Sequence, residues 1–410
     1  MSKKHIETVI KDLKDGRMII LVDDKDRENE GDIMVAAEYA TPQNINFMAR
    51  YARGLICLAM DPDLVNHLNL PLMTGNNQAP FRTNFTVSID ARYGITTGIS
   101  AYDRAKTILD CVSDKVMPYD LVVPGHIFPL KANPHGVLGR NGQTEGSVDL
   151  VKLADLKPAA VICEVMNDDG TMARRKDLEK FSKKHNIKIV HIKDLIQYRL
   201  SYDASILIRV SKTRLPTEFG EFEVVAYEST FDGNTHLALI KNENLGNKVP
   251  LVRVHSECMT GDVFGSLRCD CGDQLYSAMK RISEEKGGLI VYLRQEGRGI
   301  GLANKIRAYS AQDKGMDTVE ANRYLGFEED LRDYGIAAQI LSDLGFNKIR
   351  LLTNNPRKVL SLNYGGIDVV ERISLETKTN ELNLKYLTTK KNKLGHLLNL
   401  NSDRDLSRSR

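Results

Sequence analysis

The sequence R-V-H-S-E-C at Arg253–Cys258 is followed by C-D-C at Cys269–Cys271 and by R-Q-E-G-R-G-I-G at Arg294–Gly301. Three of the six cysteines of the chain therefore fall within the fourteen residues 258–271. Three thiolates can hold Zn²⁺ and leave the fourth tetrahedral position for water, which is the arrangement of a catalytic zinc site. Cysteines that fill an apolar core are the alternative. The metal is favoured by polar neighbours, namely Ser256, Glu257, Arg268 and Asp270.

The glycine-rich stretch follows a predicted strand at Leu289–Leu293 and precedes an expected helix. The glycines of Gly297–Gly301 let backbone N–H groups approach a polyphosphate, and Arg294 and Arg298 add positive charge. A dinucleotide-binding fold is the rival interpretation, but its fingerprint is G-x-G-x-x-G, whereas the spacing here is G-x-G-x-G. We interpret the whole stretch as a metal site beside a phosphate-binding loop.

Alternating strand and helix patterns extend outward from this stretch in both directions. A polar turn at Leu351–Lys358 ends another strand, which is where the sites of α/β proteins lie. These patterns predict an α+β protein made of two fused α/β-type domains, each with a mixed sheet and flanking helices. The strands expected in the second half are Ile206–Val210, Phe222–Glu228, His236–Ile240 and Val249–Val254, and its clearest helix is Gln274–Lys286.

The first half begins with an expected helix at Ile6–Leu13 and an apolar strand at Met18–Val22. That strand runs into the acidic stretch Asp23–Asp32, which contains Arg27. A solvated turn is the ordinary explanation of such a run. Because these acids follow a buried strand end, carboxylates for Mg²⁺ and a cation for a phosphate group would lie together. This suits a metal-assisted reaction of a sugar phosphate.

Further polar clusters follow in the first half. Thr41-Pro42 predicts a helix start, and Leu55–Met60 a strand. Hydroxyls, glycines and a histidine gather at Thr96–Thr107 and Pro124–Leu130. Glu164 lies within an apolar strand, Ala159–Val165, where an unused carboxylate would be costly to bury.

Length and composition are those of an ordinary globular protein: 410 residues, 42% apolar and 27% charged. A domain boundary is expected where a helix, Ile192–Leu200, gives way to a strand pattern, which divides the chain into residues 1–201 and 202–400. Residues 401–410 are expected to be a disordered tail. The cysteine count and the lack of a long apolar run predict a cytoplasmic protein with reduced thiols and no membrane span.

These motifs together resemble the family of bifunctional riboflavin biosynthesis proteins, which join 3,4-dihydroxy-2-butanone 4-phosphate synthase to GTP cyclohydrolase II. The resemblance covers nearly the whole chain, about residues 6–400. It is carried by V-R-V-H-S-E-C, C-D-C-G, R-Q-E-G-R-G-I-G-L, D-T-V-E-A-N and L-L-T-N-N-P-R-K. It implies that residues 1–201 form the synthase-like domain and residues 202–400 the cyclohydrolase domain.

For the cyclohydrolase half, the resemblance implies one Zn²⁺ held by Cys258, Cys269 and Cys271. Asp330 matches the family's general base, Arg332 a nucleophile proposed to attack the α-phosphate, and Tyr309 a further essential position. Since a guanidinium stays protonated, Arg332 more naturally clamps a phosphoryl group. The implied GTP contacts are Arg253, Val254, His255, Ser256, Glu257, Gln274, Glu296, Gly297, Arg298, Thr318, Thr353 and Lys358.

For the synthase half, the implied substrate is ribulose 5-phosphate, with two Mg²⁺ or Mn²⁺ ions bridged by Glu28. His126 and Glu164 match the essential acid/base pair. The implied substrate contacts are Arg27, Glu28, Asp32, Arg140, Asn141, Gly142, Gln143, Thr144 and Glu164.

Two positions depart from the family pattern in the synthase half. The pattern R-x-G-H-T-E reads R-N-G-Q-T-E here, so Gln143 replaces the histidine expected to ligate the second metal. A neutral amide oxygen competes poorly with water for such an ion. Val123 stands where the family has arginine. We expect metal occupancy and synthase activity to be impaired.

Two alternatives stay open. One is a monofunctional GTP cyclohydrolase II with a structural, inactive first domain. The other is a zinc-containing nucleic-acid-binding module, which the C-x-C spacing and the net charge of +3 disfavour. We expect GTP and ribulose 5-phosphate as ligands, Mg²⁺ with the GTP, no nucleic-acid partner and a homodimer.

Overall fold

The computed structural model describes residues 3–243, 248–327, 330–377 and 379–399. The chain divides into two compact units, Met1–Tyr198 and Arg199–Arg410. The tail expected to be disordered, residues 401–410, lies outside the described residues.

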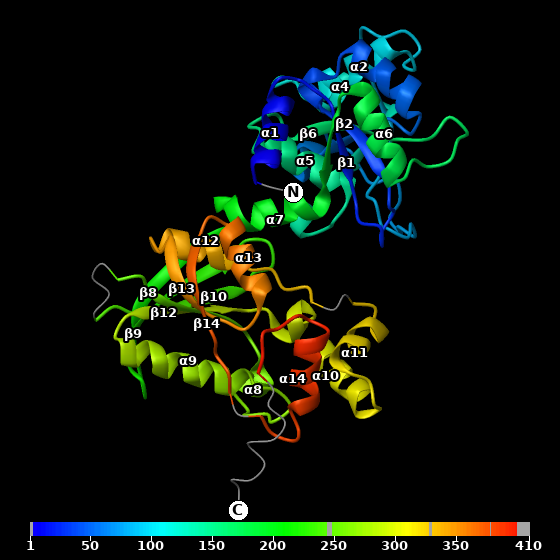
Figure 1. Ribbon diagram of the computed structural model, residues 1–410. Coiled ribbons are helices and arrows are strands. Elements are labelled where there is room, and N and C mark those ends of the chain that lie inside the picture. Colours follow the sequence, from blue (N-terminus) through cyan, green and yellow to red (C-terminus); the bar gives the residue numbers. More distant parts are fainter. Residues whose placement is uncertain (1–2, 244–247, 328–329, 378, 400–410) are drawn as a thin grey trace, which may run out of the picture. The chain divides into compact units, whose positions relative to one another are not determined.

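The first unit is built on a seven-stranded mixed sheet with the strand order β4-β5-β3-β6-β2-β1-β7 (Figure 1). Its strands are β1 (Ile19–Val22), β2 (Gly31–Ala36), β3 (Cys57–Met60), β4 (Ile89–Ala91), β5 (Leu121–Lys131), β6 (Ala159–Glu164) and β7 (Lys188–His191). Its helices are α1 (Lys3–Lys14), α2 (Pro42–Phe47), α3 (Pro62–His67), α4 (Ala101–Cys111), α5 (Gln143–Leu153) and α6 (Arg175–His185), and α7 (Ile192–Tyr202) begins in it.

Two apolar cores cover the two faces of this sheet. Alternate residues of β1 point to opposite faces, so Ile20 packs against α2, α4 and α6 while Ile19 packs against α1, α5 and α7. The central strands are therefore buried on both sides. This rigid sheet fixes the ends of β2 and β6, which carry Asp32 and Glu164.

The second unit has its own seven-stranded mixed sheet, ordered β14-β13-β11-β12-β10-β9-β8. Its strands are β8 (Leu207–Thr217), β9 (Gly220–Ser229), β10 (Thr235–Lys241), β11 (Leu251–Ser256), β12 (Gly288–Leu293), β13 (Lys348–Leu352) and β14 (Asp368–Ile373). Its helices are α8 (Met259–Asp262), α9 (Cys271–Glu285), α10 (Gly301–Asp313), α11 (Thr318–Tyr324), α12 (Gly335–Asp343), α13 (Pro356–Tyr364) and α14 (Leu384–Asn392).

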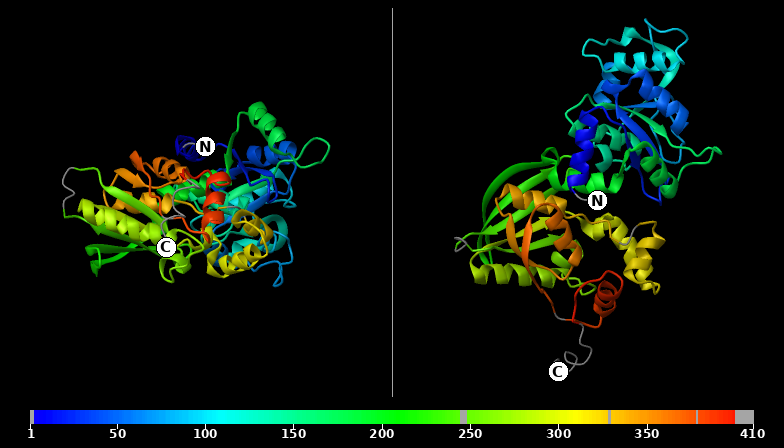
Figure 2. Two further views of the ribbon diagram at one scale, coloured as in Figure 1. Left: turned by 60° about the horizontal axis from the view of Figure 1, so that its bottom comes forward. Right: turned by 45° about the horizontal axis from the view of Figure 1, so that its top comes forward.

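Strands β13, β11 and β12 of this sheet run parallel, whereas β10, β9 and β8 continue it antiparallel. Figure 1 shows α9 on one face of the sheet and α12 and α13 on the other. Both views of Figure 2 show α14, in red, beside the yellow α10 and α11. Helix α11 contacts both α10 and α14.

The expected fold class is confirmed, since each unit holds a mixed sheet with flanking helices. The predicted helix start at Thr41 is also confirmed, because its hydroxyl accepts a hydrogen bond from the Asn44 amide at 3.2 Å. The expected helix Gln274–Lys286 begins earlier than the pattern indicated, at Cys271. Among the described residues, no helix is both long and apolar enough to cross a bilayer.

Helix α7 contains the division between the units. Ile192 and Leu195, in its first turns, belong to a core of the first unit. Its last turn belongs to the second unit, where the Gln339 side-chain amide donates to the Leu200 carbonyl at 2.9 Å and Gly335 packs closely on Leu200.

We predict that the fragments 192–410 and 203–410 both fold cooperatively, because the core of the second unit comes from its own strands and helices. The shorter fragment should melt about 2–4 °C lower, since it loses hydrogen-bond acceptors of Gln339 that contribute about 1 kcal/mol. Thermal unfolding followed by circular dichroism measures both values. A fragment 192–410 without a cooperative transition would contradict the independence of the second unit.

Candidate functional site

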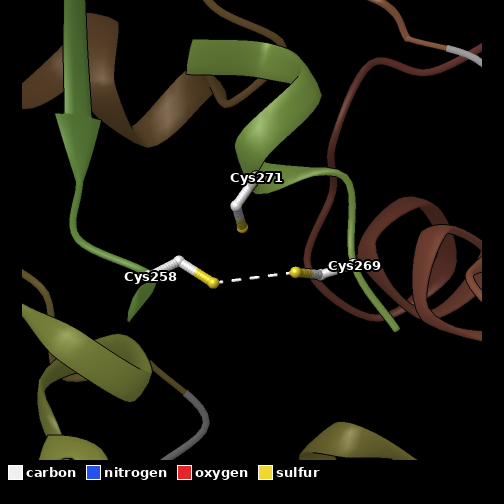
Figure 3. Close-up of side chains that lie close together, drawn as sticks. All are labelled: Cys258, Cys269 and Cys271. Atoms are coloured by element: carbon white, nitrogen blue, oxygen red, sulfur yellow. Dashed lines mark hydrogen bonds between the residues drawn. The ribbon is translucent and has the colours of Figure 1, made fainter. Parts of the chain in front are cut away.

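Three thiols meet at the carboxyl end of β11. Cys258 follows this strand, Cys269 lies in the next turn, and Cys271 is the first residue of α9 (Figure 3). The three sulfur atoms lie within 4.8 Å of one another, and those of Cys258 and Cys269 are 3.6 Å apart. Tetrahedral zinc with bonds of about 2.3 Å places two sulfur ligands about 3.8 Å apart. The cluster therefore fits a zinc ion.

Gly261 leaves room for the three thiols to converge. A Cβ atom at this position would lie 3.0 Å from the Cys269 sulfur and 3.1 Å from the Cys258 sulfur. Any side chain here would therefore push on two of the three sulfur atoms. The backbone is shaped around the cluster, which is the second observation that fits a metal.

Polar groups hold the Cys258 turn in place. The Asp262 carboxylate accepts hydrogen bonds from the Cys258 backbone N–H at 2.9 Å and from the Tyr292 hydroxyl at 2.9 Å. The His255 ring lies 3.1 Å from the same carboxylate and stacks on Tyr292. His255 is therefore engaged beneath the cysteines and is not among the residues that line the pocket described below.

A buried lysine faces the cluster. The Lys305 ammonium donates to the Cys258 sulfur at 3.1 Å and to the Glu296 carboxylate at 2.8 Å. Hydrogen bonds with the Cys269 and Cys271 thiols, together with Lys305, lower the pKa of the Cys258 thiol. A thiolate is the form that binds a metal.

A pocket that is partly open to solvent lies against the cysteines. Its lining includes all three cysteines and these sequence-predicted residues: Ser256, Glu257, Glu296, Gly297, Arg298, Tyr309, Thr318 and Arg332. Six other predicted GTP contacts, Arg253, Val254, His255, Gln274, Thr353 and Lys358, are not part of this lining.

The deeper predicted residues are connected to one another. The Arg253 guanidinium donates to the Gln274 side-chain oxygen at 2.6 Å and to the Leu352 carbonyl at 3.0 Å. The Lys358 ammonium donates to the Val254 carbonyl at 2.7 Å. Burial and the nearby Arg253 lower the pKa of Lys358 well below its usual range. Cationic side chains that disfavour one another's charge are thus grouped here, and a bound polyanion would stabilise their charged forms.

The glycine loop has the backbone that its sequence implies. Gly297 and Gly299 have φ angles of 62° and 92°, and Arg298 itself lies in the left-handed region at 64°. A non-glycine residue in this region is uncommon and typical of functional loops. The loop is anchored to β10, because the Arg294 backbone N–H donates to the His236 ring at 3.1 Å.

Asp330 and Arg332 form a bidentate ion pair with N···O distances of 2.8 and 2.7 Å. Burial alone would raise the pKa of Asp330, but the Arg332 guanidinium and the hydrogen bonds hold it at about 2. The Tyr309 hydroxyl lies 3.3 Å from that of Thr260, close to the cysteines. The expected general base therefore starts out ionised and occupied by its neighbour.

In the first unit, one guanidinium joins both residues expected to ligate metals. Arg27 donates to the Gln143 side-chain oxygen at 2.8 Å and pairs with Glu28 at 3.0 Å and Asp23 at 2.9 Å. Gln143 is buried, and its amide nitrogen has no hydrogen-bond partner in the described structure. A divalent ion at Gln143 would therefore have to compete with the Arg27 guanidinium for the same oxygen.

Asp32 and Glu164 face each other as paired residues of β2 and β6. Burial and the neighbouring Glu164 raise the pKa of Asp32 well above its usual range, and burial raises the pKa of Glu164. The Glu164 carboxylate also accepts from the Leu55 backbone N–H at 2.7 Å. Carboxyls with raised pKa values are suited to exchanging protons near neutral pH.

His126 is oriented by an aspartate. Its Nδ1 lies 2.7 Å from the Asp90 carboxylate, which also accepts from the His126 backbone N–H at 3.0 Å. Gly98 packs closely on both side chains, and its loop is held because Asp103 accepts from the Gly98 and Thr96 backbone N–H groups. This pairing fixes the ring, as a proton-transferring histidine requires.

Arg140 does not project freely. Its guanidinium pairs with Glu145 at 2.6 Å and donates to the Thr83 hydroxyl at 2.8 Å and the Phe81 carbonyl at 3.0 Å. The neighbouring predicted residues Asn141, Gly142 and Thr144 surround the start of α5. The backbone N–H groups of this helix start can receive a phosphate.

Sequence reasoning missed several residues of these sites. Lys305 lies four residues before Tyr309 on α10, a spacing that places both on one helix face and could have indicated it. Asp90 had no such signal, because its partner His126 lies 36 residues away. Asp262 lies four residues after Cys258, a spacing that could have indicated it, whereas its partner Tyr292 is 30 residues away. Tyr386, which lines the pocket, lies beyond the motifs of the second half.

Comparisons with known proteins agree with the division of the chain into two units. A family model described as 3,4-dihydroxy-2-butanone 4-phosphate synthase matches residues 7–198, and one described as GTP cyclohydrolase II matches residues 208–374. A riboflavin biosynthesis protein RibBA of Aquifex aeolicus (strain VF5) is 55% identical over 395 residues, which are 96% of this chain and 97% of that protein. The protein of the same name from Bacillus cytotoxicus is 52% identical over 396 residues, 97% of this chain and 99% of that one.

A solved structure is also similar. It is the crystal structure of RibBX, described as a two domain 3,4-dihydroxy-2-butanone 4-phosphate synthase from A. baumannii. The identity is 38% and the TM-score 0.67, and the match covers 91% of this chain and 99% of that chain.

We predict that the second unit loses stability as the pH falls from about 6.5 to about 4. Burial lowers the pKa of His236 to about 4. The usual value is about 6.5, so in this window the unfolded chain binds a proton that the folded chain does not. The dependence reaches about 1.4 kcal/mol per pH unit. His236→Asn keeps an acceptor for the Arg294 N–H but cannot titrate, so it should make the dependence less steep. The slope that remains comes from other buried groups such as His396, whose pKa is lowered to about 3.

Calorimetric unfolding of the full chain at several pH values measures this effect, with the exposed His135→Asn as the control. An equally steep loss of stability in the His236→Asn protein would show that another group is responsible.

Proposed function

The chain belongs to the family of bifunctional riboflavin biosynthesis proteins, which fuse 3,4-dihydroxy-2-butanone 4-phosphate synthase to GTP cyclohydrolase II, and we propose that its second unit opens the imidazole ring of GTP at the three-cysteine pocket. The products are formate, pyrophosphate and 2,5-diamino-6-ribosylamino-pyrimidinone 5'-phosphate. The observation that carries this proposal is the convergence of three thiols on a pocket that also holds Arg298 and Arg332.

Cys258, Cys269 and Cys271 are the residues that would hold zinc. A zinc ion bound there supplies a Lewis acid that makes hydroxide available near neutral pH for addition to C8 of the purine. The other residues of the site orient the cysteines and keep them ionised. Lys305, which is paired with Glu296, donates to the Cys258 sulfur and so keeps this thiol ionised and oriented beside the pocket. Asp262 holds the backbone of the same turn.

Arg332 and Asp330 act in sequence as the triphosphate binds. The phosphates of GTP, bound with Mg²⁺, compete with Asp330 for the Arg332 guanidinium. Release from this ion pair lets the pKa of Asp330 rise from about 2, at which a carboxylate is a weak base. Asp330 can then accept a proton, while Arg332, which stays protonated, clamps a phosphate.

The residues that lie deeper than the pocket lining are already fixed in position and can orient the purine of GTP. Arg253, Gln274 and Lys358 are buried or partly buried and held by hydrogen bonds before any ligand arrives. Side chains that are already ordered lose little entropy when a nucleotide binds. We assign them to orienting GTP from below the pocket.

For the first unit we propose ribulose 5-phosphate as substrate. Arg27 and the start of α5, with Arg140 and Thr144, recognise the phosphate group. Glu164 and the His126–Asp90 pair exchange protons with the sugar carbons, supported by the raised pKa of Glu164 and the oriented ring of His126. No step is assigned to a pair of metal ions, because Arg27 holds the Gln143 oxygen.

A second candidate function follows from that contact: a cyclohydrolase whose first unit binds the sugar phosphate without turning it over. Gln143 favours it, since its oxygen accepts from a guanidinium and is not available as a ligand. The homodimer and the cytoplasmic location stay predictions, as does the absence of a nucleic-acid partner.

Replacing Cys258, Cys269 or Cys271 singly by serine should remove most bound zinc and abolish formate release from GTP, because three ligands are the minimum for such an open site. Metal analysis and a formate assay measure the two effects. Cys111→Ser, which changes a buried cysteine of the first unit, is the matched control and should keep its zinc. Full zinc content with near-normal turnover in all three variants would remove the metal assignment.

Gln143→His should raise butanone phosphate formation at least ~10-fold, a change of about 1.4 kcal/mol in the barrier. Imidazole binds divalent ions better than an amide does, so Mn²⁺ binding by calorimetry should tighten in parallel. Gln43→His places a histidine at an exposed position of α2, outside the expected substrate contacts, and serves as the control.

Val123 could limit the rescue, so Gln143→His combined with Val123→Arg is the fuller restoration. An unmodified protein that already turns over ribulose 5-phosphate at the restored rate would show that Gln143 suffices, and that the inactive-domain candidate is wrong.

A further inference from the structure

The segment after β14 returns to the GTP pocket, although it follows the last residue, 374, that the cyclohydrolase model matches. Lys385 of α14 donates to the Gly315 carbonyl at 2.8 Å, beside the start of α11. Past the helix, the Leu397 backbone N–H donates to the Asn354 carbonyl at 2.9 Å. Hydrogen bonds therefore hold the start of this helix and the segment after it, and Figure 2 shows α14, in red, near the yellow helices.

Lys390 is the residue of α14 that reaches the metal-binding turn. Its ammonium donates to the Asp270 carboxylate at 2.6 Å, and both side chains are buried, with 7% and 2% of their surface exposed. Asp270 stands between Cys269 and Cys271 in the sequence. A charge pair so far from water needs good geometry to be tolerated, and removal of one partner leaves the other unpaired.

A line of hydrogen bonds continues from this pair to Arg253 of β11, which lies deeper than the pocket lining. The second oxygen of Asp270 accepts from the Gln274 side chain at 2.6 Å, and the Gln274 oxygen accepts from Arg253 at 2.6 Å. Arg253 also donates to the Leu352 carbonyl, on β13. Lys390 thus stands at the outer end of a chain that fixes a carboxylate, an amide and a guanidinium in one arrangement.

Tyr386, one turn before Lys390, forms part of the pocket wall. The Lys390 ammonium lies 4.4 Å and the Arg298 guanidinium carbon 5.8 Å from the centre of its ring. Both distances fit a cation–π contact, which is stronger in partly desolvated surroundings. The same helix turn therefore touches both the metal-binding turn and the glycine loop.

We propose that α14 belongs to the GTP site, with Lys390 as a positioning residue that acts through Asp270 on the Cys269–Cys271 turn and on Gln274 and Arg253. The proposal rests on the proposed cyclohydrolase function. It assigns Lys390 no contact with GTP, so its effect must pass through Asp270.

The turn after α14 is held against the helix, because the His396 backbone N–H donates to the Lys390 carbonyl at 3.0 Å. His396 is also close enough to the cations Lys390, Arg332 and Lys358 that they add to burial in lowering its pKa.

A double-mutant cycle in the full-length protein tests the proposal, with the variants Lys390→Met, Asp270→Asn and the two combined. Formate release from GTP is measured at a temperature at which calorimetry shows each variant fully folded. Lys390→Met should lower kcat/KM at least ~10-fold in the unmodified background, a loss of about 1.4 kcal/mol. In the Asp270→Asn background the same change should cost less than about 2-fold, since groups that act as one unit are not additive.

Lys391→Ala, at an exposed neighbour on the same helix, is the control and should leave kcat/KM unchanged. The combined variant should recover part of the melting temperature that Lys390→Met loses, because no charge is then left unpaired. Activity that recovers together with the melting temperature would reduce the pair to a structural role and overturn the proposal.

Two further outcomes would also overturn it: full activity of Lys390→Met, or losses that add in the combined variant. Failure of the proposed function is distinguishable, because the unmodified protein would then release no formate from GTP.

Discussion

The parallel arrangement of β12, β11 and β13 is the constraint on which the second site depends. Parallel strands bring their carboxyl ends to one edge of a sheet. Strand β11 delivers Ser256–Cys258 to this edge, β12 delivers the glycine loop, and β13 delivers the turn that begins at Thr353. Segments that lie about one hundred residues apart in the chain are thus adjacent, and the turns that directly follow the strands form the site.

The charges at this edge are balanced in pairs before any ligand is present. Lys305 pairs with Glu296, Arg332 with Asp330, and Lys390 with Asp270. An unpaired buried charge would cost several kcal/mol, so the pairing makes the site foldable. Because these pairs exist beforehand, a bound triphosphate gains only the difference in free energy between its own contacts and the ion pairs that it replaces. Arg332 lines the pocket, so a ligand can reach it and replace Asp330 as its partner. Lys390 does not line the pocket and keeps Asp270 as its partner.

What the sequence could predict depends on how local the cause was. The Thr41 cap, the cysteine spacing and the glycine loop each arise within a few residues, and the structure contains all three. Lys390 belongs to the basic stretch of residues 390–393, which reads as an ordinary solvated helix face. Its partner Asp270 lies 120 residues away, and only the return of α14 brings them together.

The distinction between local and distant causes also applies to the site of the first unit. The acidic stretch after β1 was visible in the sequence, and so was the replacement of a histidine by Gln143. The hydrogen bond between Arg27 and Gln143 was not visible in the sequence, because the two residues are 116 positions apart. An imidazole could not accept from Arg27 and ligate a metal through the same nitrogen, whereas an amide oxygen is a good acceptor for a guanidinium. The substitution therefore does more than weaken one ligand: it gives Arg27 a further hydrogen-bond acceptor beside Asp23 and Glu28, and a divalent ion at Gln143 would compete with that guanidinium.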